Sequence, residues 1–371
     1  MGEAAPDTNG AAFPESGAHG MRRNDRKAGG RARGRARKRK LWVSVGVVCL
    51  FLIVALLIGR AVQDFQHMNA QTPETQPVEM PDLSGASDAK APAVDETSAS
   101  AKTILTHADA LLRIAASADN SGWISGGQAT VVGKNDAGQC LTDDWTDIAQ
   151  LRLGDAHAIA LSADGRLLFS GSNAQGQLEL DAGGEPVRYV EAGPYASYTV
   201  LMNGTAIMAG AGPATSTQLM AQRNLLALAA SESHIALLYA DGTVALLTDG
   251  DDAQADVSSW EHIVAIDCGY GYTIALDESG TVRFAGEDRY GLGGIDGLKQ
   301  VQSIAAGVNT CYAVMNDGTV RAFGSNGSGQ AEVSGWTNVS AVAAGYMHAI
   351  ALTGDMRLLG AGSAANGRLG R

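Results

Sequence analysis

Three histidines occupy the same position of a recurring pattern, and histidine is both a common metal ligand and the usual proton-transfer group near neutral pH. His157, His234 and His348 each open a short apolar run. A residue that recurs at one position of a symmetric repeat normally belongs to the hydrogen bonding of each repeat. We therefore interpret the three histidines as structural.

Two pairs of adjacent acidic residues could also do chemistry. Asp251 and Asp252 lie in the run "TDGDDAQAD" (248–256), and Glu287 precedes Asp288. A pair with perturbed pKa values could serve a hydrolase, and the run could hold calcium, although it does not match an EF-hand loop. The chain has no Gly-x-Ser-x-Gly, His-Glu-x-x-His or P-loop motif. The sequence thus predicts no catalytic residue, no metal and no cofactor, with a hydrolase as the weakest alternative.

The chain segments that would position these residues form a sequence repeat. Apolar runs recur around a turn glycine, as in "LSADGRLLFSG" and "LDESGTVRFAG". The turn glycines are Gly127, Gly165, Gly204, Gly242, Gly280 and Gly318. From Gly165 onward their spacings are 39, 38, 38 and 38 residues, and the tail, residues 342–370, fits a seventh copy. A fixed period of this length indicates a repeat architecture.

The composition of each repeat predicts strands. Apolar residues alternate with others in runs such as "HAIAL" and "TVRAF", bounded by Gly, Asn and Asp. A 38-residue unit holds about four short strands, and seven such sheets fit a closed ring. We predict an all-β fold, a seven-bladed β-propeller over residues 103–371, with a parallel solenoid as the alternative. The boundary of the first blade and the closure of the ring stay open.

The repeat resembles that of the regulator of chromosome condensation family. The segment "VAAGYMHAIAL" (342–352) fits the family's Ala-Ala-Gly-x-x-His signature. Its Gly-x-Asn-x-x-Gly-Gln loop is matched by "GSNAQGQLEL" (171–180) and "GSNGSGQAEV" (324–333). The resemblance implies a seven-bladed propeller.

The family's function does not transfer as a whole. Its best-known activity is nucleotide exchange on a small nuclear GTPase, which fits poorly with the membrane segment described below. In repeat length and setting the chain is more similar to secreted bacterial β-lactamase inhibitory proteins with this fold. Those proteins bind their target through loops on one face, and the resemblance implies a similar use here.

The N-terminal third carries signals for membrane insertion. Residues 1–40 hold 11 Lys and Arg against 4 acidic residues, and 41–59 hold no charge. Nineteen helical residues span roughly 28 Å, close to the hydrocarbon thickness of a bilayer. The sequence predicts a basic, disordered cytoplasmic segment at 1–40 and a transmembrane helix from Leu41 to Gly59. A polar, flexible linker would follow at 60–102, with the propeller outside the cell. A cleaved signal peptide is the alternative.

Residues 60–371 are acidic, with 16 Lys and Arg against 35 Asp and Glu. Such a charge repels phosphates, so we expect no nucleic-acid partner. Outside the predicted span the chain has three cysteines, Cys140, Cys268 and Cys311, without metal-type spacing. We favour small buried residues over a Cys268–Cys311 bridge and leave the pairing open.

Alternating strands place the loop after each Gly-x-x step and the Asn-x-x-Gly-Gln loop on one face, opposite the Asp-Gly turns. The repeats differ most there, which is typical of a binding surface. The predicted partner-binding residues are Tyr195, Tyr270, Tyr290, Asn309, Tyr346, Met347, Asp251 and Asp252. Tyr and Met beside acidic residues favour an unidentified surface or secreted protein as partner. A cell-wall or glycan-binding module is the alternative.

Overall fold

The computed structural model describes residues 78–82, 110–248 and 256–370. All of them belong to one compact unit, Thr72–Arg371. The predicted cytoplasmic segment, the predicted span at 41–59 and most of the predicted linker lie outside the described residues. Within the described ranges, no helix is both long and apolar enough to cross a membrane.

Short antiparallel strands form the framework of the described structure and group into seven sheets, which we call blades 1 to 7. The strands of the first four blades are β2 (Ile114–Ala116), β3 (Asn120–Ser125) and β4 (Gln128–Gly133); β5 (Ile148–Leu153), β6 (His157–Ser162) and β7 (Leu167–Gly171); β8 (Val187–Ala192), β9 (Ala196–Leu201) and β10 (Ala206–Gly210); and β11 (Leu225–Ala230), β12 (Ile235–Tyr239) and β13 (Val244–Leu247).

Blades 5 to 7 repeat the same plan. Their strands are β14 (Ile263–Gly269), β15 (Tyr272–Asp277) and β16 (Val282–Gly286); β17 (Val301–Ala306), β18 (Thr310–Met315) and β19 (Val320–Gly324); and β20 (Val339–Ala344), β21 (His348–Thr353) and β22 (Arg357–Gly362). The short helices among the described residues are α3 (Ser216–Met220), η1 (Arg289–Ile295) and η2 (Ala365–Gly367).

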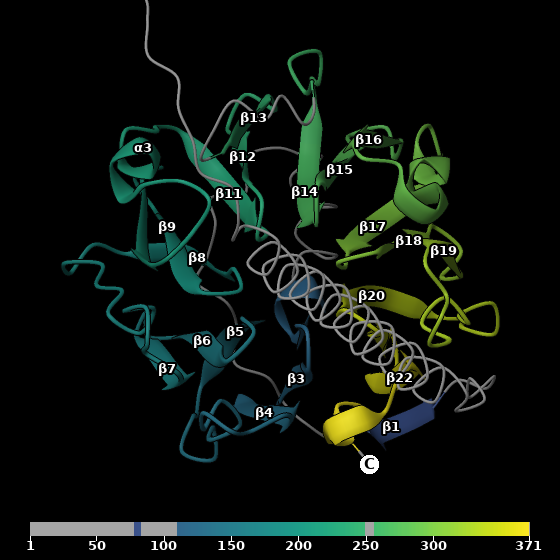
Figure 1. Cartoon of the computed structure of the whole chain (residues 1–371), viewed down its shortest axis with the longest axis horizontal. Helices are drawn as coiled ribbons and strands as arrows, with labels where there is room; N and C mark the ends of the chain where they lie inside the picture. Colours follow the sequence, from purple (N-terminus) through teal and green to yellow (C-terminus); the bar gives the residue numbers. More distant parts are fainter. Residues whose placement is uncertain (1–77, 83–109, 249–255, 371) are drawn as a thin grey trace, which may run out of the picture. The chain divides into compact units, whose positions relative to one another are not determined.

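The first strands of the blades form a ring (Figure 1). Each of β2, β5, β8, β11, β14 and β17 contacts the first strand of the next blade, and β20 contacts β2. The blades radiate outward from these strands. The described region is therefore a closed seven-bladed β-propeller, which confirms the predicted fold class for this part of the chain.

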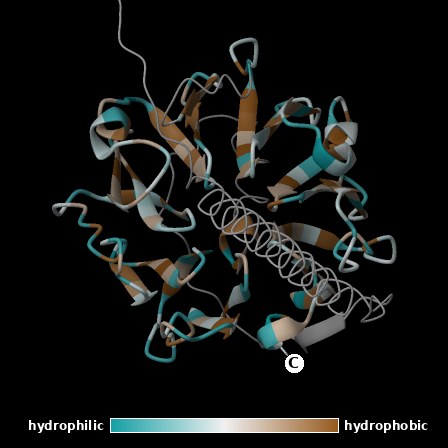
Figure 2. Cartoon of the chain, viewed as in Figure 1, coloured by the Kyte–Doolittle hydropathy of each residue, from teal (hydrophilic) through white to brown (hydrophobic). Residues whose placement is uncertain are grey.

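Apolar side chains fill the space between neighbouring blades, and the strands are correspondingly hydrophobic (Figure 2). Between blades 5 and 6, for example, Tyr272 packs with Leu292 and Ile304. Blade 1 packs on blade 7 in the same way, through Trp123 and Ile350. Because each blade buries its faces on two neighbours, the ring needs no separate core.

The expectation of four strands per repeat is wrong for blades 1 to 6, which have three. The segment after the third strand forms successive turns instead. After β7, the Asn173 side-chain oxygen accepts a hydrogen bond from the Leu178 N–H at 2.9 Å, and the Glu179 N–H donates to the Gly176 carbonyl at 3.1 Å. These local bonds satisfy the backbone, so the segment does not pair as a strand.

Blade 7 has a fourth strand from outside the repeats. β1 (Val78–Asp82) pairs antiparallel with β22, with Val78 opposite Gly360 and Asp82 opposite Arg357. These five residues fall within the predicted flexible linker, where the sequence showed no strand pattern. The edge of the last blade is thus covered by a segment that precedes the first blade.

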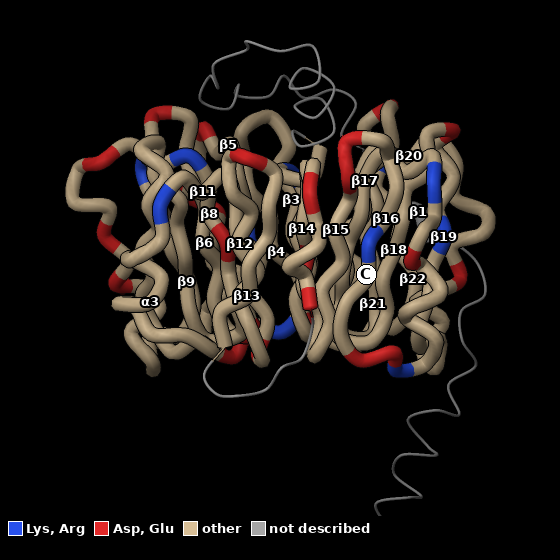
Figure 3. The backbone as a smooth tube through the Cα atoms, turned by 90° about the horizontal axis from the view of Figure 1, so that it is seen from above, with Lys and Arg blue, Asp and Glu red and all other residues tan. Residues whose placement is uncertain are grey.

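The strands run between two faces made of loops (Figure 3). The connection between the first and second strands of each blade, such as 154–156, opens on one side, which we call the loop face. The Asp-Gly turns between the second and third strands, such as 163–166, lie at the other ends of these strands. The predicted placement of these two connections on opposite sides is confirmed.

Glycine at the end of the first strand is required by close packing. A Cβ on Gly345 would lie 2.4 Å from the Ser117 carbonyl oxygen and 2.4 Å from the His348 ring, whereas one on Gly327 would meet nothing within 4 Å. We expect Gly345→Ala to lower the free energy of unfolding by about 1–3 kcal/mol, because backbone must move. Gly327→Ala is the matched control. Urea unfolding measures both, and equal effects would contradict the packing argument.

Candidate binding face

Seven residues, one from each blade, surround a cavity of about 520 Å³ at the centre of the loop face. Each follows the glycine of the Gly-x-x step or its substitute, so all occupy one position of the repeat. They are Ser117, Asp155, Pro194, Glu232, Tyr270, Val308 and Tyr346. The fold thus places the residues of one repeat position around the opening of a funnel-shaped cavity. We call these seven residues the funnel ring.

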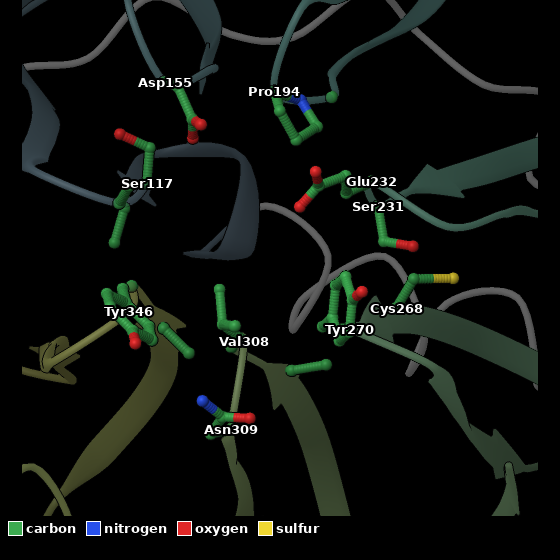
Figure 4. Close-up of a pocket in the computed structure, with 18 of the residues that line it drawn as sticks. Ser117, Asp155, Pro194, Ser231, Glu232, Cys268, Tyr270, Val308, Asn309 and Tyr346 are labelled. Carbon is green, nitrogen blue, oxygen red and sulfur yellow. The ribbon is translucent and has the colours of Figure 1, made fainter. Parts of the chain in front are cut away.

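The funnel ring has two chemically different halves (Figure 4). The side chains of Asp155 and Glu232 stand on one side of the cavity, and those of Tyr270, Val308 and Tyr346 stand on the other. Blades 1 to 4 therefore supply a polar, acidic half, and blades 5 to 7 supply an aromatic and apolar half.

Like charges crowd the acidic half. Burial, together with the negative charges of Glu232 and Asp119, raises the pKa of Asp155 to about 6, against a smaller opposing effect of Lys134. Asp119 is held by Arg368, whose Nη2 lies 3.1 Å from its Oδ1. The acidic half is therefore a region of negative potential that favours a cation.

The aromatic half contains four of the residues predicted from the sequence. Tyr270, Tyr290 and Tyr346 are exposed by 38%, 68% and 40%, and Asn309 is half-buried; all four line the cavity. The Arg289 guanidinium lies over the Tyr270 ring, 5.2 Å from its centroid, and also pairs with Glu287. This tyrosine face already accepts a cationic group.

Beside the funnel lies a smaller cleft of about 370 Å³, between blades 3 and 4. Pro194, Tyr195 and Pro213 line it, and Pro194 and Glu232 belong to both hollows. Tyr198 also lines it; its side chain is fully buried, and its hydroxyl has no hydrogen-bond partner among the described residues. The cleft and funnel form one continuous surface.

The other predicted site residues lie elsewhere. Met347 is half-buried and lines neither hollow. Asp251 and Asp252 lie outside the described residues. Of the second acidic pair, Glu287 contacts Arg289, and the Asp288 carboxylate accepts a hydrogen bond from the Gly293 N–H at 2.8 Å. Both side chains therefore have structural partners.

The sequence reasoning missed Asp155 and Glu232, although a signal for them existed. Tyr270 and Tyr346 were selected by residue type from the loop after the Gly-x-x step. Reading the same position in every repeat would have added the two acidic residues. The two residues matter together with the others at this repeat position, because the ring of blades brings all seven residues to one cavity.

Two of the three histidines at the repeated position join neighbouring blades, whereas neither ring nitrogen of His157 has a hydrogen-bond partner among the described residues. His234 Nε2 lies 2.6 Å from the Thr273 hydroxyl, and His348 Nε2 lies 2.9 Å from the Ser121 hydroxyl. The second contact joins blade 7 to blade 1. Burial lowers the pKa of His157 and His234 to about 4 and that of His348 to about 3. These findings agree with the structural interpretation of the histidines. No group of three His, Cys, Asp or Glu among the described residues could hold a metal ion.

Buried neutral histidines make the fold sensitive to acid. Their pKa is depressed, so the unfolded chain takes up protons first as pH falls from 6.5 toward 4, and stability is lost in that window. The raised pKa values of Asp155 and Asp267, about 6 and 7, act in the opposite direction over part of it. We therefore expect the free energy of unfolding of His234→Gln to depend less steeply on pH than that of the wild type, by up to about 1.4 kcal/mol per pH unit. Urea unfolding at pH 4.5 and 6.5 measures it, and identical slopes would refute the claim.

The inner strands carry a buried polar group below the loops. Glu191 accepts hydrogen bonds from the Arg152 Nε at 3.3 Å and from the Tyr189 hydroxyl at 2.5 Å. Asp267 accepts from the backbone N–H groups of Cys268 and Ala306, both at 2.8 Å. Arg152 and Glu191 join blades 2 and 3, and Asp267 joins blades 5 and 6. The group therefore stabilises the ring.

Comparison with known families places the repeat. A model of the regulator of chromosome condensation (RCC1) repeat matches residues 301–330, which hold β17, β18, β19 and the start of the loop that follows β19. Blade 6 of this seven-bladed propeller thus contains an RCC1 repeat. No curated protein sequence matches it.

Solved structures show the same fold. The CRINKLY WD40 ectodomain of the Arabidopsis thaliana receptor kinase ACR4 is 16% identical, with a TM-score of 0.53, covering 67% of this chain and 94% of the other. Yeast RCC1 (Prp20), solved bound to Kap60, is 15% identical, with a TM-score of 0.52 and coverages of 76% and 87%. The ectodomain of the Physcomitrella patens receptor kinase CR4 is 16% identical, with a TM-score of 0.50 and coverages of 65% and 69%. At such identities the likeness concerns the fold alone.

Proposed function

We propose that this seven-bladed propeller is a non-catalytic binding module, held outside the cell by a membrane span at 41–59, that recognises or inhibits a surface or secreted protein through its loop face. The observation that carries the proposal is the funnel ring. Seven loops of unequal sequence meet there and expose three tyrosines around one cavity. Exposed tyrosines on a rigid scaffold are typical of protein-binding surfaces.

The comparisons support parts of the proposal. Two structures with this fold are receptor-kinase ectodomains, and a third was solved in complex with another protein. The uncharged segment 41–59, next to the basic segment, supports a membrane anchor with the propeller outside. The likeness to β-lactamase inhibitory proteins stays a prediction from the sequence.

Two other functions have less support. A hydrolase would need a free acidic pair, whereas Glu287 and Asp288 have partners within the structure. A glycan-binding module would use the tyrosines as stacking platforms. Only one half of the funnel ring is aromatic, and the acidic half gives such a ligand little to stack on.

The test is capture of surface and secreted proteins from the source cells on the full-length chain, purified in detergent. We expect a partner that the wild type retains and that Tyr195→Ala/Tyr270→Ala/Tyr346→Ala loses, with roughly a tenfold or larger drop in affinity per important tyrosine. The matched control, Met202→Ala/Leu226→Ala, removes exposed apolar side chains near the opposite turns. Retention by the tyrosine variant would contradict the assigned face. A partner that proves to be a glycan would favour the alternative.

A further inference from the structure

The two halves of the funnel ring point to one kind of ligand group. An acidic wall faces an aromatic and apolar wall across a single cavity (Figure 4). Lysine and arginine side chains combine an apolar stem with a cationic head. Such a side chain matches both walls at once, which neither an acidic nor a purely apolar side chain does.

We infer that the funnel binds a lysine or arginine side chain on a protruding loop of the partner protein, with an adjacent apolar side chain in the cleft between blades 3 and 4. The inference rests on the proposed function and specifies the partner's chemistry. The alkyl stem lies against Val308 and Tyr346, and the cation meets Asp155 and Glu232.

The acidic half lacks a cation of its own. Neither Asp155 nor Glu232 forms an ion pair with any other residue that the structure describes, whereas Asp119 has Arg368. The nearby Lys134 is instead 3.6 Å from Asp136. Two carboxylates that face one cavity repel each other, and an incoming cation relieves that repulsion.

Two buried hydroxyl groups are left without partners along the same surface. Ser117 belongs to the funnel ring and is 9% exposed, and Tyr198 lines the cleft and is fully buried. Neither hydroxyl has a hydrogen-bond partner within the described part of the chain. Buried polar groups of a folded protein are normally satisfied, so these two hydroxyls are unsatisfied polar groups in the walls of the two hollows.

The arrangement also sets the spacing of the partner's residues. Pro194 and Glu232 line both hollows, so the apolar side chain enters directly beside the basic one. Pro194, Tyr195 and Pro213 give the cleft rigid apolar walls. Tyr195, which does not line the funnel, thereby acquires a role in the same interaction.

The test uses a library of disulfide-closed heptapeptides displayed on phage, selected on the immobilised full-length chain. We expect enrichment of Lys or Arg next to a large apolar residue. In a synthetic peptide of the selected sequence, replacing Lys by norleucine keeps the stem and removes the charge. This change should weaken binding about tenfold or more. The same change should have no effect on binding to Asp155→Asn/Glu232→Gln, because the two changes remove one interaction.

Glu185→Gln is the matched control, because it removes one exposed acidic residue next to the opposite turns. Selected peptides without a basic residue, norleucine binding as well as lysine, or no selected peptide would each overturn the inference. The proposed function fails differently, if selected peptides bind Tyr195→Ala/Tyr270→Ala/Tyr346→Ala as well as the wild type.

Discussion

Trp336→Ala is expected to lower the free energy of unfolding by about 3–5 kcal/mol, among the largest effects of a single substitution in this chain. The Trp336 side chain is fully buried between blades 6 and 7, where Tyr312 and Val342 pack in the same cluster. Removing the indole leaves a cavity that strands fixed on both sides cannot fill. Urea unfolding of the full-length chain measures the loss.

Two further variants separate packing from other effects. The Trp336 indole N–H has no hydrogen-bond partner among the described residues, so Trp336→Phe loses packing only and should cost clearly less than the alanine variant. Leu141→Ala truncates a side chain that is 65% exposed and should change stability by less than about 0.5 kcal/mol. If Trp336→Ala behaves like Leu141→Ala, the junction between these blades is not a packed core.

The blade plan could be predicted from the sequence because its signals repeat. Glycines at fixed positions of the repeat and the alternation of apolar residues in runs such as "HAIAL" are local signals. Seven copies make the pattern clear even where a single copy departs from it. Trp260 and Trp336, which lie 18 residues after the turn glycines Gly242 and Gly318, are both buried between blades. Trp145 occupies a similar place between blades 1 and 2.

The missing fourth strand and the added strand β1 could not be predicted in this way. Whether the segment after β7 pairs depends on the Asn173 side chain bonding its own loop, which competes with strand pairing over a few residues. The strand β1 depends on an open edge of β22 almost 280 residues away. A pattern read within each repeat contains neither kind of information.

For the candidate site, residue type alone predicted the aromatic half of the funnel ring and not the acidic half. Tyr270 and Tyr346 were selected because tyrosine is typical of interfaces, and the structure places them on one side of the funnel. Asp155 and Glu232 look like ordinary surface acidic residues along the chain. Only the closed ring of blades places these two residues together, across the cavity from the tyrosines, where their negative charge can contribute to binding.

Closure of the ring supplies the second large effect. We expect Leu369→Ala to lower the free energy of unfolding by about 2–5 kcal/mol, although Leu369 is the third residue from the end of the chain. Its side chain is 1% exposed and packs with Ile114 and Trp123 of blade 1 and with Ile350 of blade 7. The neighbouring Arg368 donates to the Ala118 carbonyl at 3.1 Å and pairs with Asp119.

The matched comparison for Leu369→Ala is a leucine at a junction between two internal blades. Leu219 is also fully buried, but it packs between blades 3 and 4, which are joined by continuous chain. Equal losses for Leu369→Ala and Leu219→Ala, measured by urea unfolding, mean that the junction of the first and last blades carries as much of the stability as an internal one. A negligible loss for Leu369→Ala alone would mean that the ring opens there at little cost. Because the funnel ring draws residues from all seven blades, an open junction would also separate Ser117 from Tyr346 and remove the shape of the proposed site.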